Sequence, residues 1–109
     1  MKTVLITGIG GDIAQNIATI LSESRPEFKL IGVDMNDRHA GHLFVDELFQ
    51  VPPASKTEYV GCIKALIKKY SIDITIPTTE KELAVFQPLI DEIGGNCISV
   101  GAKIIDIGI

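Results

Sequence analysis

A glycine-rich turn lies close to the first residues of this 109-residue chain and limits the folds that the chain can adopt. Gly8, Gly10 and Gly11 follow a β-branched apolar run (3–6) and come just before a segment with apolar residues at helical spacing. The run predicts a strand buried on both faces, and the later segment predicts a helix that Asp12 can cap. Strand, glycine turn and helix in this order predict the opening unit of a parallel α/β sheet. The helix is expected to face that sheet with Ile13, Ile17, Ile20 and Leu21, beside Ala14 and Ala18.

The glycine turn is compatible with three roles. Its bare amides and the helix dipole can face an anion or substrate, the glycines can simply form a tight connection, or the turn can bind a dinucleotide. The dinucleotide fingerprint Gly-x-Gly-x-x-Gly fits at Gly8 and Gly10 but has Ile13 at its third glycine position. Because Ile13 would hold the helix and strand further apart, a loop that faces an anion or a substrate is the favoured interpretation.

Composition argues against several classes of protein. The net charge of −4, the pI near 5.0 and the scattered aromatic residues provide neither a basic field nor a stacking platform for nucleic acid. No run approaches the roughly 18 apolar residues of a membrane span, and no signal peptide opens the chain. We therefore expect a cytoplasmic protein that binds neither nucleic acid nor membrane, with Cys62 and Cys97 reduced and buried.

The rest of the chain alternates strand and helix patterns. Strands are predicted at 28–34, 47–51, 72–76 and 97–100. One helix is predicted to start at Ser55 or Thr57, with an apolar, core-facing side made of Tyr59, Val60, Ile63, Leu66 and Ile67. Another is predicted to start at Thr79, with Glu82 completing a capping box and Pro88 interrupting the helix. This alternation predicts one α/β domain over 1–109, a Rossmann-like three-layer sandwich around a five-stranded parallel sheet in the order 3-2-1-4-5. The apolar segment 101–109 is expected to be a sixth element or the cut edge of a longer protein.

The predicted strand order places a candidate site where the winding of the sheet reverses. Strands one and four are neighbours there, so the loop 8–12 should lie beside the loop 77–80. Asp34 ends the second strand 26 residues after Gly8. It can either accept hydrogen bonds from a ribose or another polyol, or cap the turn that follows it.

No catalytic constellation or metal site is visible in the sequence. Glu80 and Glu82 are two apart at a helix start, so they should point in different directions and not form an acid–base pair. His39 and His42 are interpreted as solvated loop histidines, because a metal site would need further ligands, such as Asp37 or Asp46, to converge on them.

Four segments in order resemble a known family. They are Val-Leu-Ile-Thr-Gly-Ile-Gly-Gly-Asp-Ile (4–13), Gly-Val-Asp-Met (32–35), Val-Asp-Glu with Val-Pro-Pro-Ala-Ser (45–47 and 51–55), and Ile-Pro-Thr-Thr-Glu-Lys-Glu-Leu (76–83). Together they resemble the N-terminal domain of ATP-grasp ligases, and among these the proteins similar to the large subunit of carbamoyl-phosphate synthase. The likeness extends to about residue 100.

The resemblance implies a domain that forms one wall of a substrate site and is inactive alone, as the N-terminal fragment of a longer chain. ATP and Mg²⁺ would bind to a following ATP-grasp domain and not to this one, and would convert a small carboxylate substrate to an acyl phosphate that an amine or another nucleophile attacks. A homodimer is possible. The expected substrate-binding residues are Gly8, Gly10, Gly11, Asp12, Asp34, Thr78, Thr79 and Glu80, with no catalytic or metal-binding residue.

Two other interpretations stay open from the sequence. Gly8, Gly10 and Asp34 also fit a freestanding Rossmann module that binds NAD(P) or a nucleotide. A regulatory or oligomerising domain without a ligand is the third.

Overall fold

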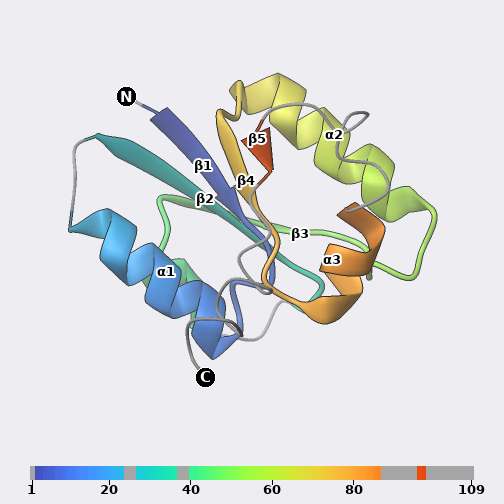
Figure 1. Cartoon of the computed structure of the whole chain (residues 1–109), viewed down its shortest axis with the longest axis horizontal. Coiled ribbons are helices and arrows are strands. Elements are labelled where there is room, and N and C mark those ends of the chain that lie inside the picture. The colour runs from blue at the N-terminus through green and yellow to red at the C-terminus, as the bar shows by residue number, and fades with distance from the viewer. Residues whose placement is uncertain (1, 24–26, 37–39, 87–95, 98–109) are drawn as a thin grey trace.

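The computed structural model describes residues 2–23, 27–36, 40–86 and 96–97. In chain order its elements are β1 (Lys2–Ile6), α1 (Asp12–Ser22), β2 (Phe28–Asp34), the 3₁₀ turn η1 (Gly41–Leu43), β3 (Glu47–Gln50), α2 (Glu58–Tyr70), β4 (Ile74–Ile76), α3 (Glu80–Phe86) and β5 (Asn96–Cys97). The alternation of strands and helices confirms the predicted α/β class (Figure 1).

The strands form a parallel sheet in which β1 lies at the centre. The predicted order is confirmed for β3-β2-β1-β4, and β5 continues it through the pairs Ile74↔Asn96 and Thr75↔Cys97. The remainder of the fifth predicted strand lies outside the described residues, as do Pro88 and the segment 101–109.

Helices cover both faces of the sheet, as the three-layer prediction requires (Figure 1). Alternate residues of β1 point to opposite sides, because successive side chains of a strand do so. Val4 and Ile6 pack in the core beneath α1, whereas Leu5 packs in the core beneath α2 and α3. All three side chains are buried, which explains why β1 reads as a continuous apolar run without polar alternation.

The face of α1 that packs on the sheet differs from the prediction. Ala14 and Ala18 are buried, whereas Ile13 is 43% exposed and Ile20 is 64% exposed. Ile17 and Leu21 complete the packed face. The two alanines let the helix backbone approach the strands closely, so the expectation that Ile13 separates helix and strand is wrong.

The predicted cap of α1 is also wrong. Gly11 occupies the N-cap position and makes no side-chain cap hydrogen bond, so Asp12 is the first helical residue. An acidic side chain in the first turn still interacts favourably with the helix dipole.

The predicted apolar face of α2 is confirmed. Tyr59 and Ile63 are buried in the core, and Leu66 and Ile67 pack against it. Of the two predicted starts, the structure places Thr57 at the N-cap, without a side-chain cap hydrogen bond.

Three further sequence predictions concern single residues. Cys62 is free and half-buried, while His42 is exposed in η1 and His39 lies outside the described ranges. Within those ranges no group of histidine, cysteine and acidic residues could hold a metal ion. None of the helices in the described part of the chain is long and apolar enough to cross a membrane.

Candidate functional site

A cleft of about 430 Å³ opens at the carboxyl ends of the strands. Five segments line it: the glycine turn, the residues 34–36 after β2, the segment 51–55, the start of α2 and the start of α3. Both α1 and α3 begin at this edge of the sheet (Figure 1). The cleft therefore lies where the winding reverses, as expected for a ligand site in an open parallel sheet.

Thr7 and Thr78 fasten the two loops that meet at this point. The backbone N–H of Thr78 donates to Thr7 Oγ1 at 3.1 Å, and Thr78 Oγ1 donates to the Thr7 carbonyl oxygen at 2.7 Å. Both threonines are buried. This pair of hydrogen bonds fixes the loop after β4 against the end of β1.

Gly8 leaves room for that close approach. Its φ of +61° lies in the left-handed region, and a Cβ there would sit 2.8 Å from both Thr78 Oγ1 and Thr79 Cγ2 and 3.3 Å from Glu82 Oε1. Any larger residue would combine backbone strain with a collision against the loop after β4. Gly8 is therefore required by the architecture of the cleft.

The amides of the glycine turn donate to protein oxygens. Ile9 N–H donates to the Val33 carbonyl at 3.1 Å and Gly11 N–H to the Gly8 carbonyl at 2.9 Å. Gly10 N–H donates to Asp34 Oδ2 at 2.8 Å. Because these three donors are already engaged, the turn is poorly suited to cradle a phosphate.

Asp34 holds the glycine turn and also caps the turn that follows β2. Its Oδ1 accepts the backbone N–H of Asn36 at 2.9 Å, while its Oδ2 accepts that of Gly10. Of the two sequence interpretations, the structure therefore supports turn capping. Asp34 also lines the cleft, where its negative charge disfavours an anionic ligand.

Glu82 is the most distinctive group in the cleft, because its side chain is only 8% exposed. Tyr59 Oη donates to Glu82 Oε2, and Thr79 Oγ1 donates to Glu82 Oε1 at 2.9 Å. Burial raises the pKa of the Glu82 carboxyl above its ordinary value of 4.5. The hydroxyls of Tyr59, Thr79 and Thr7 partly oppose that rise in pKa, and the charge of Asp34 adds to it.

Beside these two acids, the cleft offers one cation and an apolar wall. Lys81 is the only basic residue among the described residues that line it, and it is exposed. Pro52, Pro53 and Ala54 form the apolar side. A ligand with an amine near Glu82 and an aliphatic part against the prolines would match both surfaces.

Comparison with protein-family models identifies the relationship. The model described as PylC-like, N-terminal domain, matches residues 4–100. The chain belongs to the PylC-like N-terminal domain family. A comparison with curated protein sequences gives no significant match.

Solved structures show the same fold as this PylC-like domain. N5-carboxyaminoimidazole ribonucleotide synthetase from Thermotoga maritima aligns with a TM-score of 0.68 and 19% identity over 95% of this chain and 26% of that chain. The glycinamide-RNase-transformylase T from Mycobacterium tuberculosis aligns with a TM-score of 0.68 and 13% identity over 95% of this chain and 34% of that chain. The match to the PylC-like model over residues 4–100 confirms the predicted family, an N-terminal domain of the kind that precedes an ATP-grasp fold, and the two solved structures share its fold.

A dinucleotide enzyme also shares the fold. dTDP-glucose 4,6-dehydratase from Bacillus anthracis, solved in complex with NAD, aligns with a TM-score of 0.60 and 14% identity over 84% of this chain and 34% of that chain. At this identity the likeness concerns the fold alone. The PylC-like domain spans about a quarter to a third of the chains that it resembles.

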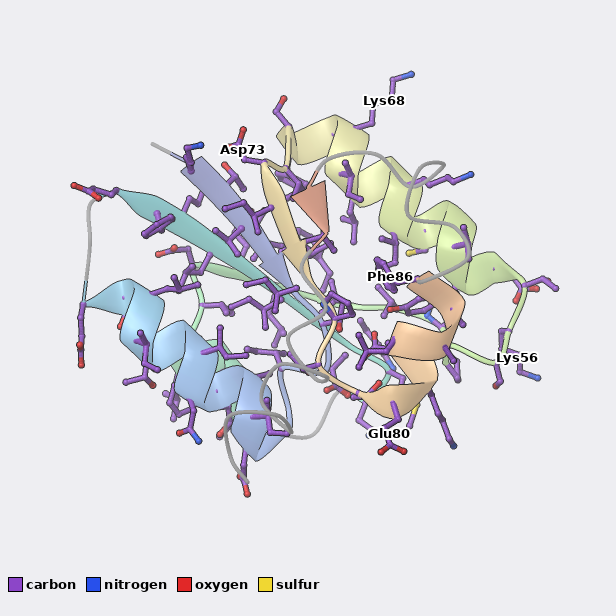
Figure 2. All side chains as sticks on the ribbon, in the orientation of Figure 1. Lys56, Lys68, Asp73, Glu80 and Phe86 are labelled. Atoms are coloured by element: carbon purple, nitrogen blue, oxygen red, sulfur yellow. The ribbon has the colours of Figure 1, made fainter. Side chains whose placement is uncertain are left out.

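The structure separates the predicted site residues of the PylC-like domain into two groups. Gly8, Gly10, Gly11, Asp34 and Thr79 line the cleft. Asp12, Thr78 and Glu80 are not among its lining residues. Figure 2 shows the Glu80 side chain pointing outward from the start of α3, and the residue is exposed. Two residues along a helix correspond to about 200°, which is why Glu82 faces inward when Glu80 faces solvent.

Tyr59 and Glu82 are the cleft residues that sequence reasoning assigned to other roles. Tyr59 was interpreted as a core residue of α2, and Glu82 as half of a capping box. That capping is only partly confirmed: Glu82 N–H donates to Thr79 Oγ1 at 3.2 Å, but the Glu82 carboxyl turns inward to Tyr59. The sequence contained one indication that Glu82 faces inward. Glu82 and Phe86 are four residues apart, so they lie on the same face of α3, and that face is buried.

Proposed function

We propose that this chain is the substrate-side N-terminal domain of an ATP-dependent carboxylate–amine ligase, and that its cleft receives the amine-bearing substrate. The single observation that carries the proposal is the Glu82 carboxyl, buried at the cleft in a PylC-like N-terminal domain. Hydroxyl groups hold this carboxyl, and no buried cation among the described cleft residues neutralises it. An ammonium group would supply the missing charge through charge-assisted hydrogen bonds.

The reaction requires more than this domain. The chain spans 26% and 34% of the two ligases that it resembles in fold. We propose that ATP, Mg²⁺ and the carboxylate bind to an ATP-grasp domain, supplied by further residues or by a partner, and that this domain alone is inactive. Substrate specificity like that of carbamoyl-phosphate synthase, a homodimer and a cytoplasmic location stay predictions.

A dinucleotide is the less suited occupant of this cleft. The amides of Ile9, Gly10 and Gly11 donate to protein oxygens and not into the cleft. Asp34 and Glu82 would bring negative charge close to a pyrophosphate. Both features disfavour a phosphate at the glycine turn.

The test measures ligand binding to this chain by calorimetry and by the shift in Tm. The probes are a panel of amino acids and aliphatic amines, each with the analogue in which a hydroxyl replaces the amino group, together with NAD and ATP with Mg²⁺. An amine at 100 times its Kd should stabilise the chain by about 2.7 kcal/mol. The hydroxyl analogue should bind at least about tenfold more weakly, because it lacks the charge-assisted bond.

The matched variants are Glu82→Gln and Glu80→Gln. Both remove one carboxylate from α3, but only Glu82 lies in the cleft. Glu82→Gln should abolish amine binding, and Glu80→Gln should retain it. Equal binding of amine and hydroxyl analogue, or binding of NAD with no response to any amine, would overturn the proposed function.

A further inference from the structure

Tyr59 reaches the cleft from a different part of the chain than Glu82 does. It lies in the first turn of α2, its side chain is 1% exposed, and its ring packs edge-on against Phe86 of α3 with centroids 6.1 Å apart. Its hydroxyl donates to Glu82 Oε2. The ring is thus held on one side by α3 while its hydroxyl is directed at the carboxyl group.

The Glu82 carboxyl is held by hydroxyls from two separate segments, Tyr59 on α2 and Thr79 before α3. Thr79 Oγ1 donates to Oε1 at 2.9 Å, and the Thr7 hydroxyl at the end of β1 also lowers the pKa of the carboxyl. Thr7 is itself oriented, because its Oγ1 accepts the Thr78 N–H. Neutral hydroxyls fix the orientation of a carboxylate without supplying a compensating positive charge.

We infer that Tyr59 is a positioning residue of the cleft: its hydroxyl fixes the Glu82 carboxyl in the orientation that receives a substrate amine, and thereby sets the preference for an amine over a hydroxyl. This inference rests on the proposed function. Without the bond from Tyr59, the carboxyl could rotate about its side-chain torsions and share its lone pairs with water. An amine would then have to order Glu82 on binding.

The ionisable groups around Glu82 determine how its pKa changes when one of its neighbours is substituted. Among the described residues they are Tyr59 on α2, Asp34 at the end of β2 and Lys81 on α3. Burial and Asp34 raise the pKa of Glu82, while the Tyr59 hydroxyl lowers it. Loss of that hydroxyl should therefore raise the pKa of Glu82 further, and amine affinity, which needs the ionised carboxylate, should appear at higher pH.

The experiment compares Tyr59→Phe with Tyr70→Phe. The second variant removes the other hydroxyl of the two tyrosines, at a ring that packs on Phe49 away from the cleft. The readouts are the titration midpoint of the Glu82 carboxyl, followed by ¹³C NMR, and the pH profile of the affinity for the tightest amine of the panel. We expect Tyr59→Phe to raise the midpoint of the Glu82 titration and the midpoint of the pH profile of binding, and to weaken amine binding by about tenfold. Tyr70→Phe should change neither midpoint nor affinity.

A second variant keeps the inference testable if Tyr59→Phe does not fold. In the Tyr70→Phe background Tyr59 is the only tyrosine, so growth on 3-fluorotyrosine labels it alone. Fluorine makes the phenol a stronger donor, and the Glu82 midpoint should then fall below that of unlabelled Tyr70→Phe. A merely structural role of the ring predicts no such fall.

The outcomes distinguish the inference from the function on which it rests. If the original chain binds no amine, the proposed function fails and the inference fails with it. If it binds an amine and Tyr59→Phe leaves affinity, pH profile and the Glu82 midpoint unchanged, the inference alone is overturned. Raised midpoints with weakened binding support both.

Discussion

The two ends of the parallel sheet use acidic side chains differently. At the amino end, Asp73 Oδ2 accepts a hydrogen bond from the Thr3 N–H at 2.8 Å, and the Asp73 N–H donates to the Thr3 carbonyl oxygen at 2.8 Å. Asp46 makes the same pair of 2.8 Å bonds with Leu30. At the carboxyl end, the buried Glu82 carboxyl accepts side-chain hydroxyls. Figure 2 shows Asp73 and Glu80, the start of α3, at opposite ends of the sheet.

This difference separates acids that fix strand register from an acid that remains available for a ligand. Asp73 precedes β4 and Asp46 precedes β3, and each clamps the neighbouring strand. The nearby Glu47 is neutralised by Lys29 at 2.9 Å, which raises the pKa of the lysine. No cation pairs with Glu82 among the described ion pairs. Backbone N–H groups and one lysine engage the acids at the amino end, whereas side-chain hydroxyls hold the Glu82 carboxyl at the cleft.

We expect the greatest loss of stability from a substitution of Gly8. Gly8→Ala should destabilise the chain by about 2–4 kcal/mol, because left-handed strain adds to the collision with Thr78 and Thr79. In thermal unfolding this corresponds to a fall in Tm of roughly ten degrees or more. Gly61→Ala on α2 is the control, since its Cβ would meet nothing within 4 Å. It should stabilise the helix by about 0.5–1 kcal/mol, and equal Tm values for the two variants would contradict the assigned role of Gly8.

The next effect compares one aspartate from each end of the sheet. Asp34→Ala removes two partners of backbone N–H groups, at 2.8 and 2.9 Å, and should cost about 2–3 kcal/mol in urea denaturation. Asp73→Ala removes one exposed bond and should cost about 1 kcal/mol. Asp34→Ala should also weaken amine binding, whereas Asp73→Ala should leave it unchanged. Comparable loss of binding in both would remove the functional distinction between the two ends.

The smallest effect is a change in the pH dependence of stability. The pKa of Glu82 is raised in the folded chain, so its contribution to the free energy of unfolding is fully present below pH 4.5 and is lost as pH rises through the folded pKa. Glu82→Gln lacks this loss. Its stability relative to the original chain should therefore rise with pH across that window, in a series of Tm measurements from pH 4 to about 8. A difference that stays flat across that window would show that burial does not raise the pKa of Glu82.

Local sequence patterns were sufficient for the arrangement of the main chain. The apolar run of β1, the glycine turn and the apolar face of α2 each follow from neighbours within a few residues. The order of β3, β2, β1 and β4 then follows from how right-handed crossovers wind an α/β sheet. These predictions place the loops after β1 and β4 side by side, as the bonds between Thr7 and Thr78 confirm.

The α/β class, the winding of the sheet and the edge at which its loops converge could thus be predicted from the sequence, because they depend on periodicity and turn chemistry. Which side chains face that edge depends on packing between distant segments. Ala14, and not Ile13, is buried on the packed face of α1, since close approach to the strands favours a small residue. Glu82, and not Glu80, faces the cleft, where Tyr59, 23 residues away in the sequence, donates a hydrogen bond to it. Such choices depend on distances between segments that are remote in sequence, and these distances exist only in the folded chain.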